Sequence, residues 1–136
     1  MKSPDEIVHH LMLANDAFSQ LLEMQIVALD MGTCTLSCPV SAQTTNGFGI
    51  AHGGLTYALA DSALAFASNS RGFQCMSIDT QISHLAKVKL GDSLSAHCTE
   101  LHRGKRTGVY EVKITNQDQK LVAYFKGTVF VSELVW

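Results

Sequence analysis

Residues 55–70 read LTYALADSALAFASNS, and they define the central element of the predicted fold. The run consists mostly of Ala, Leu, Ser and aromatic residues, and it stops at Arg71-Gly72, a helix end signal. Apolar residues surround the helical axis almost completely, which is typical of a buried helix. The sequence therefore predicts a buried helix of about four to five turns. A single carboxylate, Asp61, interrupts it.

Asp61 needs an explanation, because a buried carboxylate without partners is costly. It must pair with a cation, accept several hydrogen bonds or line a cleft. The residues three and four positions away are Tyr57, Ala58, Leu64 and Ala65, so no cation of the same helix is within reach. Two interpretations remain: a hydrogen bond to a distant backbone group or tyrosine hydroxyl, and a cleft in which the carboxylate is functional. We favour the cleft.

Runs rich in Val, Ile, Thr and Cys flank this helix and predict strands. Residues 25–39 form a predicted hairpin that turns at Met31-Gly32. After Gly72, strands are expected at 74–88, 93–102, 107–116 and 120–135, joined by tight turns into an antiparallel meander. Ser3-Pro4-Asp5-Glu6 is a capping box that starts an amphipathic helix reaching about residue 22. The predicted class is α+β, with a sheet of about six strands curled around one apolar helix.

Length and composition narrow the range of functions. With 136 residues the chain predicts a single domain, 1–136. The net charge of −2 gives no field that would attract nucleic acid. Neither a secretory signal nor a membrane span is evident, so we expect a cytoplasmic protein. The cysteines form no CxxC pair, which favours free structural thiols over a disulfide or a metal site. The histidines at 9, 10, 97 and 102 lack metal-ligand spacing, and no metal is expected.

His52-Gly53-Gly54 stands where a loop enters the helix. Glycines there leave backbone N–H groups unshielded at the positive end of the helix dipole, where they could stabilise an oxyanion. The alternative is a tight loop that passes close to the sheet. Gly53 and Asp61 are eight residues apart, which is about 12 Å along one helix. One substrate carbonyl cannot meet both, so joint chemistry requires the antiparallel helix of a second subunit.

Asn46, HGG at 52–54, LAD at 59–61 and NSRG at 69–72 together resemble the PaaI-type hot-dog thioesterases, the branch named for phenylacetyl-CoA thioesterase of phenylacetate degradation. The resemblance runs from about residue 5 to residue 130 and includes GD at 91–92, GK at 104–105 and VAYFKGTVF at 122–130. It implies a hot-dog fold, a homodimer with joined sheets that usually assembles into a tetramer, and no cofactor beyond the coenzyme A of the substrate.

The resemblance also implies roles for five residues. Asp61 would activate water or attack the thioester carbonyl, and the Gly53 N–H of the other subunit would polarise that carbonyl. Asn46 would orient the water or the carbonyl, while His52 would mainly hold the loop. Ser77 would help to hold the attacking water; the alternative is a buried strand serine.

Substrate contacts are expected at turns and strand ends, where relatives receive the coenzyme A nucleotide. Ordinary solvated charges are the alternative for each basic residue. Relatives often carry an aromatic-Leu-Arg-Pro stretch where this chain has HLAK at 84–87, which puts the local contacts in question. The candidates are Gly54, His84, Lys87, Lys89, Arg103, Gly104, Lys105 and Arg106.

The predicted function is that of an acyl-CoA thioesterase acting on an aryl-acetyl or a medium-chain to long-chain acyl group. A hydratase or dehydratase on the same fold and a non-catalytic acyl-CoA-sensing module are the alternatives. The acyl pocket is expected to draw on Phe48, Leu55, Tyr57, Leu64 and the loop 44–51.

Overall fold

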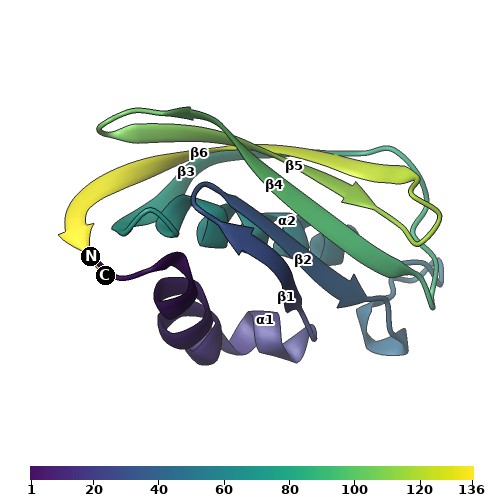
Figure 1. Ribbon diagram of the computed structural model, residues 1–136. Helices are drawn as coiled ribbons and strands as arrows, with labels where there is room; N and C mark the ends of the chain where they lie inside the picture. Colours follow the sequence, from purple (N-terminus) through teal and green to yellow (C-terminus); the bar gives the residue numbers. More distant parts are fainter.

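Six strands form one antiparallel sheet that curves around a long helix, α2 (Figure 1). The computed structural model describes residues 1–136. The predicted α+β architecture is confirmed. The elements are β1 (Gln25–Asp30), β2 (Thr33–Pro39), α2 (Gly53–Asn69), β3 (Phe73–His84), β4 (Ser93–Arg103), β5 (Thr107–Thr115) and β6 (Leu121–Val135).

The predicted meander is wrong for β3. The sheet order is β1-β2-β4-β5-β6-β3, so β3 pairs with β6 instead of its successor β4. β3 ends at His84, and residues 85–92 form a connection that the N–H of Leu85 ties to the carbonyl of Val122 in β6. The turn predicted at 90–92 therefore lies at the end of a crossover, and the other edge of β4 pairs with β2. As a result β3 is an edge strand.

Helix α2 lies close against the concave face of the sheet because the contact residues are small. Ala60, Ala63 and Ala67 are completely buried. On β6, a Cβ atom at Gly127 would lie 2.7 Å from Cδ2 of Leu64, so any side chain there would force Leu64 to shift. The missing side chain at 127 thus lets the helix approach the sheet.

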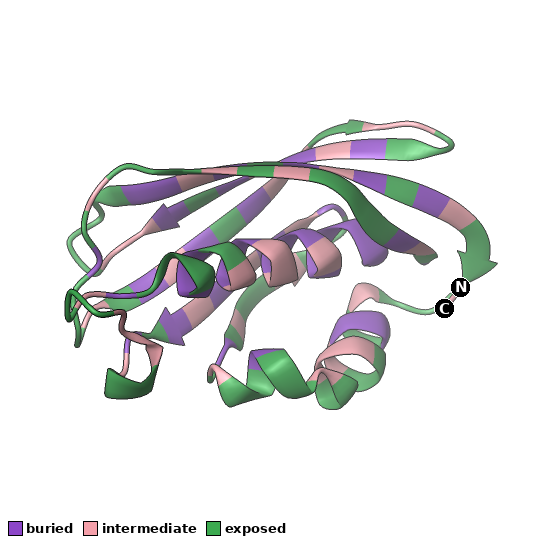
Figure 2. Cartoon of the chain, turned by 180° about the vertical axis from the view of Figure 1, so that it is seen from behind, coloured by how far each residue is buried: buried purple, intermediate pink, exposed green.

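The prediction that α2 is buried all round is wrong for one side. Tyr57 is exposed, and Ala58, Asp61, Ser62 and Ala65 are half-buried. Figure 2 shows half-buried and exposed residues recurring along α2. We call this stripe of five residues the open face of α2. Most residues of the open face are small or apolar, and this is why the sequence pattern predicted that the whole helix is buried.

The N-terminal capping box is present: the N–H of Ser3 donates to Glu6 at 2.7 Å, and the N–H of Glu6 donates to Ser3 Oγ at 3.2 Å. The chain then forms η1 (Glu6–Met12), η2 (Leu13–Asn15) and α1 (Ala17–Leu21) instead of one continuous helix. The break occurs at Asp16 (φ −92°, ψ 84°), whose carboxylate accepts from the N–H of Ser19 at 3.0 Å and caps α1. A local side-chain bond to the backbone competes with helix continuation here.

A polar network closes the C-terminal end of α2. Arg71 donates two hydrogen bonds to Glu100, at 2.7 and 2.8 Å, and the hydroxyl of Tyr110 donates a third at 2.8 Å. Burial alone would raise the pKa of Glu100, but these donors outweigh burial and hold it below its ordinary value. Arg103 joins the network through Tyr110 and the carbonyl of Ser68, both at 3.0 Å.

All four cysteines are free and buried, as predicted. Cys34 and Cys98 are direct partners across β2 and β4. Burial raises the pKa of Cys34 to about 12, so this thiol stays protonated. None of the helices combines the length and the apolar character needed to cross a membrane.

Candidate functional site

Asp61 projects from the open face of α2 into two cavities. The first, which we call the outer groove, has a volume of about 690 Å³ and lies between α2 and the N-terminal helices. The second, the strand cavity, has about 250 Å³ and lies between α2 and β3. The outer groove is lined by Leu11, Met12, Asn15, Asp16, Phe18, Ser19, Gly54, Tyr57, Ala58, Asp61, Ser62, Ala65, Phe66 and Trp136.

The carboxylate of Asp61 has no partner, since it forms neither a hydrogen bond nor an ion pair. The interpretation in which it bonds a distant backbone group or tyrosine hydroxyl is therefore wrong. Partial burial raises the pKa of Asp61, and the negative charge of Asp16 raises it further. A half-buried carboxylate with raised proton affinity in a cleft is typical of a functional site.

The start of α2 leaves one N–H group free. His52 donates its own N–H to the carbonyl of Thr44 at 2.9 Å, and its carbonyl accepts from Leu55 at 2.9 Å. The Nδ1 atom of His52 accepts from the N–H of Gly54 at 2.7 Å. Gly53 alone among these residues has an N–H without an acceptor. The free donor lies at the positive end of the helix dipole, where it can bind a developing oxyanion.

The loop before α2 is shaped by Asn46. It begins with η3 (Ala42–Thr44), and the Oδ1 atom of Asn46 accepts from the N–H groups of Phe48 and Ile50 at 3.0 and 3.4 Å. The side-chain amide nitrogen of Asn46 has no partner and stays available as a donor. Phe48 at the tip is 88% exposed, and it lines neither the outer groove, the strand cavity nor the cavity beside Gly53.

His84 lies beside the free N–H donor. Its Nε2 atom is 3.3 Å from the position that a Cβ of Gly53 would take, and its Nδ1 is 3.3 Å from the hydroxyl of Thr56. That hydroxyl donates to the carbonyl of Gly53 at 3.0 Å. Gly53, Thr56, His84 and Lys87 line a third cavity of about 330 Å³, the loop cavity. The structure thus brings two predicted substrate residues to the predicted oxyanion donor.

Ser77 and Asp61 line the same strand cavity, together with Met76 of the edge strand. This places the predicted water-holding serine next to the carboxylate. Gly53 is absent from that cavity, since it lies eight residues from Asp61, or about 12 Å along α2. The candidate residues of one chain therefore form two half-sites at different heights of the same helix.

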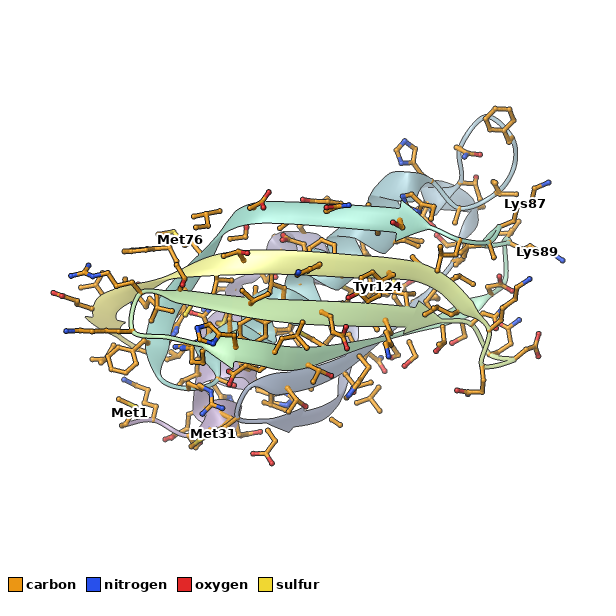
Figure 3. The ribbon with its side chains drawn as sticks, turned by 90° about the horizontal axis from the view of Figure 1, so that it is seen from above. Met1, Met31, Met76, Lys87, Lys89 and Tyr124 are labelled. Carbon is orange, nitrogen blue, oxygen red and sulfur yellow. The ribbon has the colours of Figure 1, made fainter.

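The predicted basic residues do not form one cluster. Lys87 lines the loop cavity at the N-terminal end of α2, and Figure 3 shows Lys87 and Lys89 together at one end of the sheet. Arg103 contacts the carbonyl of Ser68 at the other end of α2, about 24 Å away along a helix of 17 residues. Because Arg103 is bound within the polar network, we interpret it first as a structural residue.

The remaining turn residues lie near Arg103. Gly104 donates its N–H to the carbonyl of Thr107 at 2.8 Å and closes the turn between β4 and β5. Lys105 is exposed, and Arg106 approaches Glu133 at 3.8 Å. Gly54 lies at the other end of α2 and is required by the cap, because a Cβ there would lie 2.9 Å from Nδ1 of His52.

Sequence reasoning missed the residues that complete the outer groove, above all Asp16. Its only signal was local: Asn15-Asp16 interrupts an otherwise helical pattern, and Asp is a preferred N-cap residue. The Oγ atoms of Ser19 and Ser62 lie 2.8 Å apart across 43 residues of sequence, a contact that no local pattern indicates.

Residues 48–123 match the thioesterase superfamily. The chain belongs to this superfamily. The acyl-coenzyme A thioesterase PaaI of Escherichia coli is 41% identical to this thioesterase over 118 residues, which cover 87% of this chain and 84% of the relative. Together these matches confirm the predicted PaaI type and the predicted class of thioester hydrolase.

Solved structures agree. The structure of E. coli PaaI superposes on this thioesterase with a TM-score of 0.91 at 38% identity, covering 93% of this chain and 92% of that chain. A Streptococcus mutans protein bound to acetyl CoA superposes with a TM-score of 0.78 at 32% identity, covering 80% and 88%. The predicted hot-dog fold is confirmed.

Proposed function

We propose that this thioesterase hydrolyses an acyl-CoA thioester, with Asp61 as the reacting carboxylate and the Gly53 N–H of a second copy as the oxyanion donor. One observation carries the proposal: both groups lack partners, and they lie about 12 Å apart along one helix. Neither half-site can complete the reaction by itself. A second α2 running antiparallel would bring each Asp61 to the other chain's Gly53.

The edge strand β3 supplies a surface for this assembly. It bonds only to β6, and its apolar side chains Met76 and Ile78 are 66% and 62% exposed. Exposed apolar edge strands pair readily with another strand. Pairing of β3 with β3 of a second copy would join the two sheets and place the open faces of both α2 helices side by side. We infer a homodimer as the catalytic unit, and the family resemblance makes a tetramer the expected assembly.

In the proposed reaction, the thioester carbonyl accepts a hydrogen bond from the Gly53 N–H and becomes more electrophilic. Asp61 either removes a proton from water as the water attacks or attacks the carbonyl carbon itself. When water attacks, the C–S bond then breaks, the proton taken by Asp61 passes to the thiolate of coenzyme A, and the free acid leaves. When Asp61 attacks, C–S cleavage leaves an acyl anhydride on Asp61, and a water molecule then hydrolyses this anhydride, which releases the free acid, regenerates the carboxylate and supplies the proton of the thiol. Its raised pKa makes Asp61 a stronger base than an exposed aspartate. No metal or cofactor takes part in this scheme.

The surrounding residues receive supporting roles. Ser77 is assigned the role of holding the attacking water, which its position in the same cavity as Asp61 supports. The free amide nitrogen of Asn46 can orient the carbonyl from the loop. His52 holds the HGG turn. The acyl group, aryl-acetyl or a longer chain, is assigned to the outer groove, whose apolar lining includes Tyr57 and not the buried Leu55 or Leu64.

The dimer would also bring basic residues from the two chains close to one another. When two α2 helices run antiparallel, the N-terminal end of one lies beside the C-terminal end of the other. Lys87 and Lys89 of one chain would then face Lys105 and Arg106 of its partner. This arrangement can bind the phosphates of the coenzyme A nucleotide, whereas the residues of one chain are too far apart.

The test compares wild type with Asp61→Asn by release of free thiol from phenylacetyl-CoA, hydroxybenzoyl-CoA and fatty acyl-CoAs of increasing length. We expect a loss of at least about 100-fold on the best substrate. Asp118→Asn, in the exposed turn before β6, is the matched control and should retain full activity. Light scattering checks that each variant keeps its assembly.

The same panel separates the alternatives. Binding of acyl-CoA without thiol release by wild type would favour a sensing module. Turnover of an enoyl-CoA with no thiol release would favour a hydratase. Equal thiol release by wild type and Asp61→Asn would reject Asp61 as the reacting group.

A further inference from the structure

The outer groove contains a second carboxylate, which belongs to the N-terminal segment. We propose that Asp16 is a positioning residue for the reaction: its fixed negative charge next to the open face of α2 makes Asp61 a stronger base. This inference rests on the proposed role of Asp61, and it assigns a catalytic purpose to the break that separates η2 from α1. Asp16 acts through Asp61 and does not itself need to contact the substrate.

Asp16 is held by two hydrogen bonds from one residue. Its Oδ1 accepts from the N–H of Ser19 at 3.0 Å, and its Oδ2 accepts from the hydroxyl of Ser19 at 2.6 Å. Ser19 is only 1% exposed, so the anchor itself is rigidly enclosed. Both carboxylate oxygens are therefore fixed in direction, unlike those of a solvated surface aspartate.

A further hydrogen bond links this carboxylate to the catalytic helix. Ser19 Oγ lies 2.8 Å from Oγ of Ser62, the residue that follows Asp61 in α2. The single hydroxyl proton of Ser19 points to Asp16, so Ser62 must be the donor in the second bond. The chain Ser62 to Ser19 to Asp16 fixes the height of the second charge along α2. It keeps the charge beside Asp61 and not elsewhere in the groove.

Nothing in the groove neutralises this charge. The outer groove and the strand cavity, which together surround Asp61, contain no lysine, arginine or histidine. The other titratable side chains there are the phenol of Tyr57, on α2, and the thiol of Cys75, on β3. Trp136 also lines the outer groove. Burial is the first cause of the raised pKa of Asp61, and Asp16 is the one charged neighbour that adds to it.

A purely structural role for Asp16, as the cap of α1, predicts different behaviour. Asn is as good an N-cap as Asp, so Asp16→Asn keeps the oxygen that accepts from the Ser19 N–H, replaces the second oxygen with an NH2 group that can donate to the Ser19 hydroxyl, and removes the charge. Loss of a structural contact would lower the rate at every pH alike. Loss of a charge would lower the pKa of Asp61, which moves the acid limb of the pH–rate profile and weakens the base on the plateau.

The experiment measures wild type and Asp16→Asn in two ways. Carbon-13 NMR of labelled aspartate follows the titration of Asp61, whose signal is assigned by its absence in Asp61→Asn. The pH dependence of kcat/KM for the best acyl-CoA substrate follows its catalysis. We expect Asp16→Asn to lower the pKa of Asp61, to move the acid limb to lower pH, and to reduce the plateau by about two- to tenfold. Asp118→Asn, which removes a carboxylate from an exposed turn outside both cavities, should leave the acid limb at its wild-type position.

The two readouts separate the inference from the function on which it rests. An Asp61 titration that is unchanged in Asp16→Asn overturns the inference whatever the activity does. A titration that moves while the acid limb stays in place supports the coupling between the carboxylates and rejects Asp61 as the base. If the plateau of kcat/KM falls while neither the Asp61 titration nor the acid limb moves, Asp16 acts only as the N-cap of α1.

Discussion

The Nδ1 atom of His52 accepts a hydrogen bond from the N–H of Gly54 at 2.7 Å. This bond fixes the ring at the start of α2 and leaves the proton of the neutral imidazole on Nε2. No carboxylate contacts the ring, so His52 lacks the acid partner that orients a histidine base. The histidine of the HGG turn is a helix cap in this structure.

Replacing His52 should therefore affect stability before chemistry. His52→Asn supplies an N-cap oxygen in place of the Nδ1 acceptor and should retain thiol release within about threefold. His52→Ala removes the cap and should lower the free energy of unfolding by about 0.5–2 kcal/mol. Urea denaturation and the thiol assay measure both effects. An Asn variant with wild-type stability and no activity would give His52 a chemical role.

Gly53 can be tested by removing only its N–H. Proline at the first helical position lacks this donor and fits the helix, and His52 has the extended backbone (φ −64°, ψ 139°) that a residue before proline adopts. Gly53→Pro should lower kcat by about 10²–10³-fold without unfolding the protein. Gly53→Ala is the control, because its Cβ meets His84 at the same 3.3 Å while the N–H remains. Equal losses in both variants would assign the defect to crowding at His84.

The two edges of the sheet offer a matched test of assembly. Ile78 on β3 and Val27 on β1 each sit at a bulge of an edge strand and are 62% and 65% exposed. Lysine on an edge opposes strand pairing. Ile78→Lys should yield a monomer by light scattering that has lost thiol release, whereas Val27→Lys should remain assembled and active. An active monomer of Ile78→Lys would show that the site is complete within one chain.

Asp61 should also cost stability in a pH-dependent way. Its pKa in the folded protein is raised above the ordinary value of 3.8, so the folded state binds more protons than the unfolded state between these two values. Stability therefore falls as the pH rises through this window. Asp61→Asn should unfold at a higher temperature than wild type at neutral pH, and the difference should vanish below the ordinary value. A gap in Tm that is independent of pH would indicate a cause other than the charge.

The sequence predicted the central helix, the sheet of six strands and a cleft at Asp61, because these follow from local patterns. It did not predict the position of β3, since pairing with β6 depends on a connection that is tied across the sheet at Leu85 and Val122. It also missed the break at Asp16, where one side-chain bond outweighs a helical pattern that extends past it.

The candidate site was predictable to a similar degree. The HGG turn and the rise of the helix indicated two half-sites and a second chain. That Gly53 holds the free N–H follows from hydrogen bonds to Thr44 and His52 that only the structure shows. The basic residues were predicted from their types, and a sequence gives no sign that Arg103 is engaged by Ser68 and Tyr110.

Gly127 touches none of the reacting groups, yet it sets the clearance between α2 and the sheet. A side chain there would push against Leu64, which lies three residues along the helix from Asp61, and would move α2 away from the sheet. Raising the helix would move the carboxylate away from Ser77 and, in the proposed dimer, away from the Gly53 N–H of the second copy. A substitution at 127 would therefore present as an active-site defect, although the altered residue lies under the helix on a strand that contributes no chemistry.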